Sequence, residues 1–138
     1  QDPTMPLARI SVPTHLSAER VQALADAVHG GLVATCNVPV DDHFQLITRF
    51  APDAMIINPT FPDVHRTADA SIVEIHFLRG RTDAQKAALY RHVADAAMRG
   101  GFAGDDIFIA LVENGPMDWS MGRGEPFSAS HVQAAAHA

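Results

Sequence analysis

The dipeptide Met5-Pro6, at the head of an apolar run, is the feature of this chain with the most direct chemical consequence. Initiator methionine is normally removed when the next residue is small, and proline qualifies. We therefore expect residues 1–5 to be a vector-derived extension ending in the initiator methionine, and residues 6–138 to form a single domain. The mature chain would then begin with the secondary amine of Pro6, which can serve as an acid, a base or a nucleophile. The alternative is structural, because proline is also common at the first residue of an edge strand.

Two arginines separated by one residue, Arg79 and Arg81, follow the third predicted strand. Residues i and i+2 of a strand point to the same side, so the sequence predicts that the two guanidinium groups converge. Two arginines beside a helix N-terminus suit a carboxylate, which they bind through charge-assisted hydrogen bonds. The alternative is a solvated strand end. In both cases we expect the two side chains to be exposed, so that replacing them barely changes stability.

Asp42 precedes the second predicted strand, next to Asp41. An aspartate in such a position is most often a turn or capping residue. If its carboxylate lies near the amine of Pro6, it favours the protonated amine, whereas nearby arginines favour the neutral one. The balance between these charges decides whether Pro6 acts as an acid or as a base.

The elements that must position these groups form one unit used twice. Each unit is a strand, a capped helix and a second strand. The first unit contains strands 7–12 and 44–50 around a helix that Ser17 caps and Asn37 ends. The second contains strands 72–78 and 107–112 around a helix opened by the capping box Thr82-x-x-Gln85 and stopped by Gly100. Ser17 and Thr82 lie 65 residues apart, and the aspartate pairs 41–42 and 105–106 lie 64 apart, which indicates a duplicated motif.

Two such units predict an α+β fold, because each β-α-β crossover places its helix on one face of a shared sheet. We expect a four-stranded mixed sheet with both helices on the same face. The opposite face is then uncovered and expected to be too apolar for water, which predicts self-association. The long polar segment 51–70 between the units has a length that is often functional. The tail from Asn114 is expected to form a hairpin that crosses to a neighbouring copy, and the Ala-rich end to be mobile.

Composition narrows the classes of function. The net charge of −6 and a pI near 5.6 argue against nucleic acid, and no apolar run approaches the roughly 20 residues that span a bilayer. The single cysteine, Cys36, excludes an internal disulfide, fits a cytoplasmic protein and is expected in the core. The eight histidines show no metal-ligand spacing, and His29 is expected to be structural. Gly122-x-Gly124 does not join a strand to a helix, as a dinucleotide-binding loop does.

With these features together, the chain resembles the tautomerase superfamily, and within it the malonate semialdehyde decarboxylases. The resemblance extends from Pro6 to about Phe127. Its most specific parts are Pro6-Leu7, Val38-Pro39-x-x-Asp42-x-Phe44-Gln45, Arg79-x-Arg81, and Val112-Glu113-Asn114 followed by Asp118-Trp119-Ser120.

The resemblance implies a homotrimer of β-α-β-β-α-β subunits that needs no cofactor, with the amino-terminal proline as the catalytic group. The positions that match the catalytic set are Pro6, Asp42, Arg79 and Arg81. Those that match the substrate-binding set are Arg79, Arg81, Trp119, Met121 and Phe127. Met121 stands where the resemblance leads us to expect a phenylalanine, so the pocket of this chain is expected to differ in shape.

The activity that the resemblance implies is the decarboxylation of a short 3-oxo acid, namely malonate semialdehyde to acetaldehyde and carbon dioxide. One alternative in the same fold is a tautomerase acting on 2-oxo acids such as phenylpyruvate. Another is a hydratase of unsaturated acids. From a different class, a trimeric binding or signalling protein with a structural Pro6 is possible, since the superfamily also contains cytokines.

Overall fold

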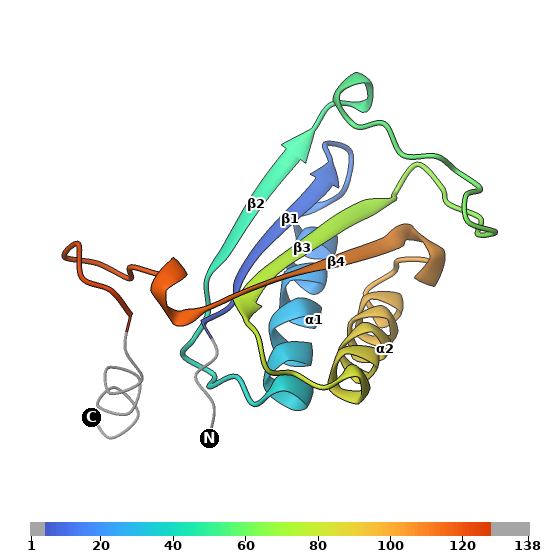
Figure 1. The fold of residues 1–138 in the computed structure, drawn as a ribbon. Coiled ribbons are helices and arrows are strands. Elements are labelled where there is room, and N and C mark those ends of the chain that lie inside the picture. The colour runs from blue at the N-terminus through green and yellow to red at the C-terminus, as the bar shows by residue number, and fades with distance from the viewer. Residues whose placement is uncertain (1–4, 128–138) are drawn as a thin grey trace.

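Both predicted β-α-β units are present in the computed structural model, which describes residues 5–127 (Figure 1). The first unit consists of β1 (Leu7–Pro13), α1 (Ala18–Cys36) and β2 (Gln45–Phe50). The second consists of β3 (Ser71–Leu78), α2 (Asp83–Arg99) and β4 (Ile107–Asn114). One-turn 3-10 helices at Pro52–Ala54, Gly104–Asp106 and Pro116–Asp118 lie in the connections and the tail. Neither α-helix of the described part is long and apolar enough to cross a membrane.

The strands form one mixed sheet in the order β2-β1-β3-β4. The pairs β1–β2 and β3–β4 are parallel, as a β-α-β crossover requires, and the central pair β1–β3 is antiparallel. Both helices cover the same face of this sheet (Figure 1). The predicted α+β fold is therefore confirmed. Leu7 is paired with His76, so the start of β1 lies beside the end of β3.

The core lies between the sheet and the two helices. Alternate residues of the central strands point toward the helices, while α1 and α2 contribute apolar side chains at helical spacing. These side chains are almost completely buried; the strand residues are Ala8, Ile10, Val12, Val73, Ile75 and Phe77, and the largest helix residues are Leu24, Val28, Leu89 and Val93. Cys36 is buried in the same core, as predicted.

The ends of the helices follow the predicted signals. The Ser17 hydroxyl accepts a hydrogen bond from the Arg20 main-chain N–H at 3.2 Å and opens α1. Asn37 ends α1 in the left-handed conformation, with φ of 58°, which asparagine tolerates better than most residues. The capping box of Thr82 and Gln85 is complete at the start of α2.

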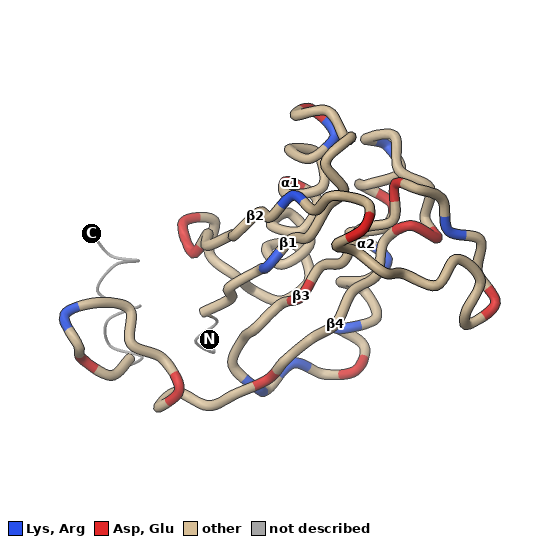
Figure 2. Tube along the Cα trace, turned by 90° about the horizontal axis from the view of Figure 1, so that it is seen from above, with Lys and Arg blue, Asp and Glu red and all other residues tan. Residues whose placement is uncertain are grey.

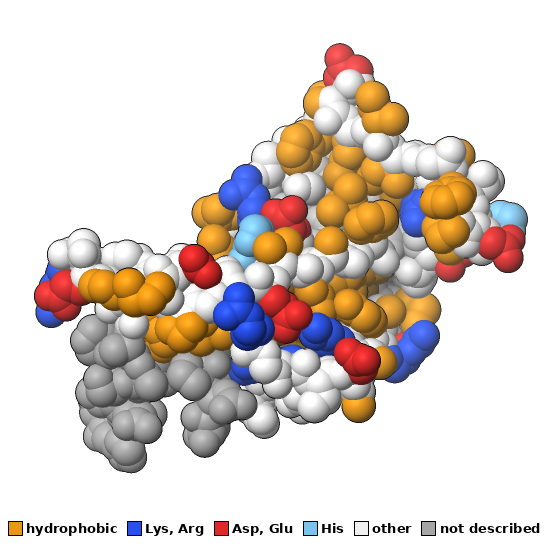
Figure 3. All heavy atoms as spheres, in the orientation of Figure 1, with side chains coloured by type: hydrophobic (Ala, Val, Ile, Leu, Met, Phe, Trp, Pro, Cys, Tyr) orange, Lys and Arg blue, Asp and Glu red, His pale blue; other side chains and the backbone are white. Residues whose placement is uncertain are grey.

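The sheet face away from the helices is less apolar than the sequence led us to expect. Leu46, Phe108 and Val112 are 50%, 44% and 40% exposed on it. A polar stripe also crosses the face, because Glu74 contacts Arg9 at 3.8 Å and His76 at 3.0 Å. Figure 3 shows apolar side chains gathered over the upper part of the face and charged ones across its middle. The strand alternation that buries the inner residues of β1 and β3 turns these polar residues outward.

The tail after β4 does not form the predicted hairpin of strands within its described part, residues 115–127. It begins with a one-turn 3-10 helix and then folds back, and the Phe127 main-chain N–H bonds the Trp119 carbonyl at 2.9 Å. Gly122, Arg123 and Gly124 all have positive φ, and three such residues in a row interrupt a strand. Figure 1 shows the tail running away from the helices at the end of the sheet where β1 begins, and Figure 2 shows the same part of the tail from above. The Ala-rich end lies outside the described residues.

The loop 51–70 is fastened to the second unit by the aspartate pair that precedes β4. The Asp106 side chain is 1% exposed and accepts hydrogen bonds from the Thr67 main-chain N–H, at 2.7 Å, and from the Thr67 hydroxyl. Asp105 is exposed and accepts one hydrogen bond, from the His65 main-chain N–H at 2.8 Å. Burial therefore separates two adjacent aspartates that look alike in the sequence.

We predict that Asp106→Ala lowers the free energy of unfolding by roughly 1.5–3 kcal/mol or more, the range for a hydrogen bond to a charged group, because two donors of Thr67 lose their acceptor. The matched variant Asp105→Ala should cost less than about 1 kcal/mol, since water replaces its carboxylate. Urea denaturation of both variants measures the difference. Equal losses would show that the buried carboxylate is not the anchor of the loop.

Candidate active site

The residues that the sequence nominated for catalysis lie at one end of the sheet. The β1–β3 register, continued outward from the pair Leu7–His76, places Pro6 next to Phe77. Arg79 follows directly at the end of β3, and its main-chain N–H bonds the Asn114 carbonyl at the end of β4 at 2.9 Å. The antiparallel centre of the sheet thus brings together two parts of the chain that are more than seventy positions apart in the sequence.

Asp42 reaches this end of the sheet from the loop between α1 and β2. Its Oδ2 accepts a hydrogen bond from the main-chain N–H of Met5 at 3.1 Å, immediately before Pro6. The loop is held from α1, where Nε2 of His29 bonds the Val40 carbonyl at 2.8 Å, and the His29 ring stacks on His43 with centroids 3.9 Å apart. His29 therefore has the structural place that was expected. It supports the segment that carries Asp42.

Met5 is 4% exposed and Pro6 is also buried. The φ angle of Met5 is 50°, a left-handed conformation that a residue with a side chain seldom adopts and that the residue before a proline ordinarily avoids. The Met5 side chain packs in a small apolar cluster with Leu78 and Phe127, against which Trp119 also packs. The buried start of β1 is therefore surrounded by apolar side chains on one side and approached by the carboxylate of Asp42 on another.

Two predicted pocket residues, Trp119 and Phe127, are brought by the tail to Met5, the residue before Pro6. The indole Nε1 of Trp119 donates to Oδ1 of Asn114 at 2.6 Å, and the Phe127–Trp119 main-chain bond closes the loop behind it. Leu78 and Asn114, which position this wall, were not singled out as site residues by the sequence. Asn114 carried a usable signal, because an asparagine before Gly-Pro at a strand end is typical of a turn.

The sequence predicted that Arg79 and Arg81 converge, because residues i and i+2 of a strand point to the same side. That strand geometry does not extend to these two residues. Strand β3 ends at Leu78, and Gly80 has a φ of 130°, so the alternation of a strand is lost between the two arginines. Nη1 of Arg79 passes close over Gly115, where an added Cβ would lie 2.9 Å from it. A side chain at position 115 would therefore displace the end of this exposed arginine.

Arg81 is only 7% exposed, contrary to the expectation of a solvated strand end. Its Nη2 donates to the main-chain carbonyl of Cys36, the last residue of α1, at 3.0 Å. The last turn of α1 contains no basic residue of its own. A guanidinium at this carbonyl end satisfies an orphan acceptor and complements the helix dipole. Arg81 therefore stabilises the end of α1 as well as standing near the loop that carries Asp42.

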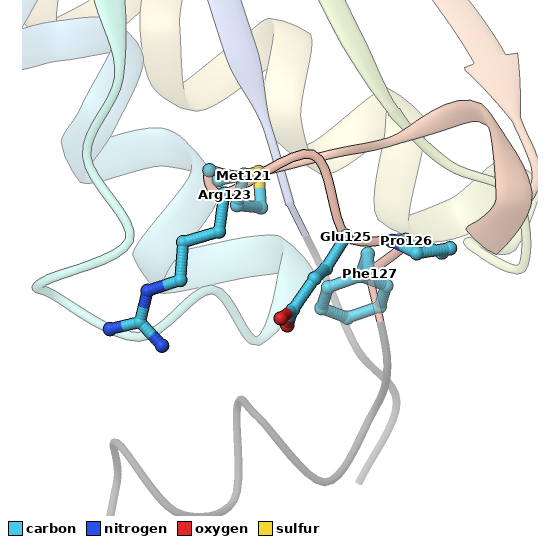
Figure 4. A pocket seen from close by; sticks show the side chains of 6 residues that line it. Met121, Arg123, Glu125, Pro126 and Phe127 are labelled. Atoms are coloured by element: carbon cyan, nitrogen blue, oxygen red, sulfur yellow. The ribbon is translucent and has the colours of Figure 1, made fainter.

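Met121 and Phe127 line a hollow of about 270 Å³ that the tail makes by itself. Met121 and Arg123 come from one limb of the loop, and Glu125, Pro126 and Phe127 from the other (Figure 4). Pro6, Asp42 and the two arginines do not line this hollow. Only Phe127 belongs both to the hollow and to the apolar cluster around Met5.

An ion pair between α2 and β4 lies near this end of the sheet. Glu113 of β4 accepts a hydrogen bond from Nζ of Lys86 on α2 at 2.9 Å, and this bond raises the pKa of the Lys86 ammonium above its ordinary value. Within residues 5–127 no three His, Cys, Asp or Glu side chains are gathered as a metal site. The groups gathered here are the start of β1 with Pro6, a carboxylate and arginines beside an apolar wall.

Comparison with known proteins identifies the family to which a chain with this fold and this arrangement belongs. The family described as "Tautomerase enzyme" matches residues 42–122, and the chain belongs to this family. The probable tautomerase YusQ of Bacillus subtilis (strain 168) is 32% identical over 121 residues, which cover 87% of this chain and 95% of that protein. The probable tautomerase YrdN of the same organism is 29% identical over 122 residues, 88% and 94% of the two chains.

Solved structures agree with this assignment. The FG41 malonate semialdehyde decarboxylase inhibited by 3-bromopropiolate has a TM-score of 0.82 and 34% identity, over 94% of this chain and 96% of that one. A second malonate semialdehyde decarboxylase structure has a TM-score of 0.81 and 28% identity, over 94% and 98%. The macrophage migration inhibitory factor of Toxoplasma gondii shares the fold, with a TM-score of 0.67 and 14% identity over 87% and 98% of the chains.

Because only one of the two arginines is buried, we predict that they differ in their effect on stability. Arg81→Ala should lower the free energy of unfolding by roughly 1.5–3 kcal/mol, since it removes a charged donor from the end of α1. Arg79→Ala should change it by less than about 0.5 kcal/mol, as for most exposed positions. Urea denaturation of the two variants tests this. Identical stabilities would mean that Arg81 contributes no more to stability than an exposed arginine at a strand end.

Proposed function

We propose that the form of this chain beginning at Pro6 is a cofactor-independent decarboxylase of a short 3-oxo acid. The reaction is the conversion of malonate semialdehyde to acetaldehyde and carbon dioxide. One observation carries the proposal: Met5 stands between the Asp42 carboxylate and the apolar cluster of Leu78, Trp119 and Phe127. The similarity to two malonate semialdehyde decarboxylases over 94% of the chain supports it.

Removal of residues 1–5 changes this end of the sheet in two ways. It takes away the buried Met5 side chain and so opens an apolar space beside Pro6. It also replaces the Met5 amide, whose N–H bonds Asp42, by the free amine of Pro6 one residue further on. An amide nitrogen is neither basic nor nucleophilic, whereas a secondary amine is both. The proposed active site is therefore complete only after residues 1–5 have been removed.

In the proposed reaction, Arg79 and Arg81 bind the substrate carboxylate. The protonated amine of Pro6 donates a hydrogen bond to the aldehyde oxygen, or condenses with the aldehyde to an iminium with loss of water. The C–C bond to the carboxylate then breaks, carbon dioxide leaves, and its electron pair forms an enol or enamine. Protonation at carbon, with hydrolysis in the iminium case, gives acetaldehyde. The apolar wall favours this step because a localised carboxylate charge is lost.

A tautomerase is the second candidate, and the names of the sequence relatives favour it. Two probable tautomerases of Bacillus subtilis are 32% and 29% identical to the chain. In the ketonisation direction, the neutral amine of Pro6 takes the proton from the enol oxygen of a 2-oxo acid and returns it to the carbon next to the 2-oxo group. A hydratase is a further variant, because one of the similar decarboxylase structures is described as a basis for decarboxylase and hydratase activities. Parallel assays with malonate semialdehyde, phenylpyruvate and a propynoate separate the three, and inactivity toward all would favour a binding protein.

We also propose a homotrimer, with the open sheet face as the surface that copies share. A fused 4-OT symmetric trimer has the same fold, with a TM-score of 0.71 and 20% identity over 91% of this chain and 98% of that one. Leu46, Phe108 and Val112 are exposed on the open face and would be covered by such an assembly. The polar stripe of Arg9, Glu74 and His76 would lie inside the same surface.

The first prediction of this proposal concerns processing. The form that begins at Pro6 should decarboxylate malonate semialdehyde, and the form that retains residues 1–5 should be nearly inactive, because its proline nitrogen is an amide and Met5 fills the apolar space. Acetaldehyde release by the two purified forms measures this. A Pro6→Ala variant of the processed form, which keeps a primary amine, is the matched control. Equal activity with and without residues 1–5 would remove the amine from the mechanism.

The second prediction separates decarboxylase from tautomerase by the charge on Pro6. A carboxylate beside the amine raises the amine pKa above the ordinary value of about 7.7–8.0 for an α-amino group. Asp42→Asn should therefore lower that pKa and reduce decarboxylation at neutral pH, where the protonated amine is required. Ketonisation of phenylpyruvate, which requires the neutral amine, should be preserved or increased.

The pH–rate profiles of both reactions in wild type and Asp42→Asn give the measurement. Asp41→Asn is the control, because Asp41 is the exposed neighbour in the same turn. An unchanged amine pKa in Asp42→Asn would leave Asp42 with the turn role only.

A further inference from the structure

A second cavity lies at the opposite end of the sheet from Pro6. It has a volume of about 210 Å³ and is formed where β1 and β2 end and β3 begins. We call it the Arg66 pocket; its apolar lining is Pro13, Phe50, Pro52, Met55, Ile57, Pro59, Ala68 and Ala70, and its polar lining is His15, Arg66 and Thr67. Most of this lining comes from the loop 51–70, whose length had suggested a functional role. The proposed decarboxylation uses none of these residues.

Arg66 is the fixed cation of this pocket. Its Nη1 donates to the main-chain carbonyls of Asn58 at 2.7 Å and of Phe61 at 2.6 Å, so the guanidinium is held in place by the loop itself. The Nε–H of Arg66 is buried and has no hydrogen-bond partner within residues 5–127. No carboxylate of that part of the chain lies within ion-pair distance of Arg66. A small anion that enters the cavity can therefore pair with the Arg66 guanidinium, which borders it.

Asp69, next to two residues that line the pocket, already accepts hydrogen bonds from other side chains. Asp69 accepts from Nε2 of His15 at 2.7 Å and from Nη1 of Arg20 at 3.0 Å. The hydrogen bond from His15, followed by that from Arg20, keeps the pKa of Asp69 below its ordinary value. Asp69 therefore balances two neighbouring cationic or donor groups and does not pair with Arg66, whose guanidinium carbon lies 5.9 Å from the ring centroid of Phe108.

We propose that the Arg66 pocket binds a small organic carboxylate with an apolar body, such as an aromatic acid, independently of the Pro6 site. A carboxylate is a suitable partner for the Arg66 guanidinium, and the proline, phenylalanine, methionine and isoleucine side chains match an apolar body. The volume is below the roughly 300–1,000 Å³ typical of sites for drug-sized ligands, which restricts the ligand to a small acid. An apolar wall with one fixed charge favours such an acid over an inorganic anion, which gains nothing from the wall.

Benzoate is a suitable probe, with benzamide as its neutral counterpart. The chain contains one tryptophan, Trp119, at the Pro6 end, so its fluorescence reports binding there. Main-chain amide NMR shifts of Thr67, Ala68 and Ala70 report binding in the Arg66 pocket. We expect benzoate to shift these three amides in a saturable way, with the same affinity in forms that begin at Pro6 or retain residues 1–5. Benzamide should bind roughly tenfold or more weakly.

Variants locate the interaction. Arg66→Gln should weaken benzoate binding roughly tenfold or more, and Arg66→Lys, which keeps the charge but loses the loop contacts of the guanidinium, should lie between it and wild type. Arg91→Gln, which changes an exposed arginine of α2, should bind as wild type does. Ile57→Trp keeps Arg66 but fills the apolar side of the cavity, and should abolish binding even if Arg66→Gln disturbs the loop.

Three results would overturn the proposal. Benzoate and benzamide could bind equally, or benzoate could shift only residues around Trp119. Alternatively, wild type could fail to bind benzoate while the amides of Met55 and Ile57 shift on dilution, which would show that a second copy of the chain occupies the cavity. None of these results depends on whether the Pro6 form is a decarboxylase.

Discussion

The antiparallel pairing of β1 with β3 is the constraint on which the rest of the structure depends. Because Leu7 is opposite His76, the first residues of β1 emerge beside the last residues of β3. Each outer strand is parallel to its inner neighbour, so the loops after α1 and after β4 lead to the same end. A shift of this register would move Pro6 away from Arg79. It would also turn the buried residues of β1 toward water, and the core therefore protects the geometry of the site.

The same type of hydrogen bond occurs in both β-α-β units and holds a segment at each of the two ends of the sheet. In each unit an aspartate in the turn before the second strand accepts a main-chain N–H from the segment that leads into the first strand. Asp42 does so with Met5, and Asp106 does so with Thr67. In the second unit the carboxylate is buried and anchors a long loop. In the first unit the same kind of anchor lies next to Pro6, whose nitrogen would become an amine beside it after the proposed removal of residues 1–5.

The charged groups around Pro6 differ in how firmly their neighbours hold them and in how exposed they are to water. Asp42 lies one residue from the proline nitrogen and favours a protonated amine. Arg81 opposes this, but its guanidinium is drawn to the Cys36 carbonyl and the negative end of the α1 dipole. Arg79 is exposed, and water screens its charge. In the proposed form that begins at Pro6, these placements would favour the protonated amine, which the proposed decarboxylation uses.

Local signals in the sequence determined the elements of this protein, whereas contacts between distant segments decided the site. Ser17, Asn37 and the Thr82–Gln85 box act within a few residues of themselves, so the helix ends could be predicted; the alternation in β1 and β3 likewise determined which side chains face the core. The burial of Arg81 could not be predicted, because it depends on where the last turn of α1 lies relative to the end of β3. The tail wall made by Trp119 and Phe127 was nominated by resemblance alone, and only the fold shows the cluster with Met5 and Leu78 that holds it. The difference in burial between Asp105 and Asp106, and the pocket around Arg66, required the path of the loop 51–70, in which no periodic pattern fixes the conformation.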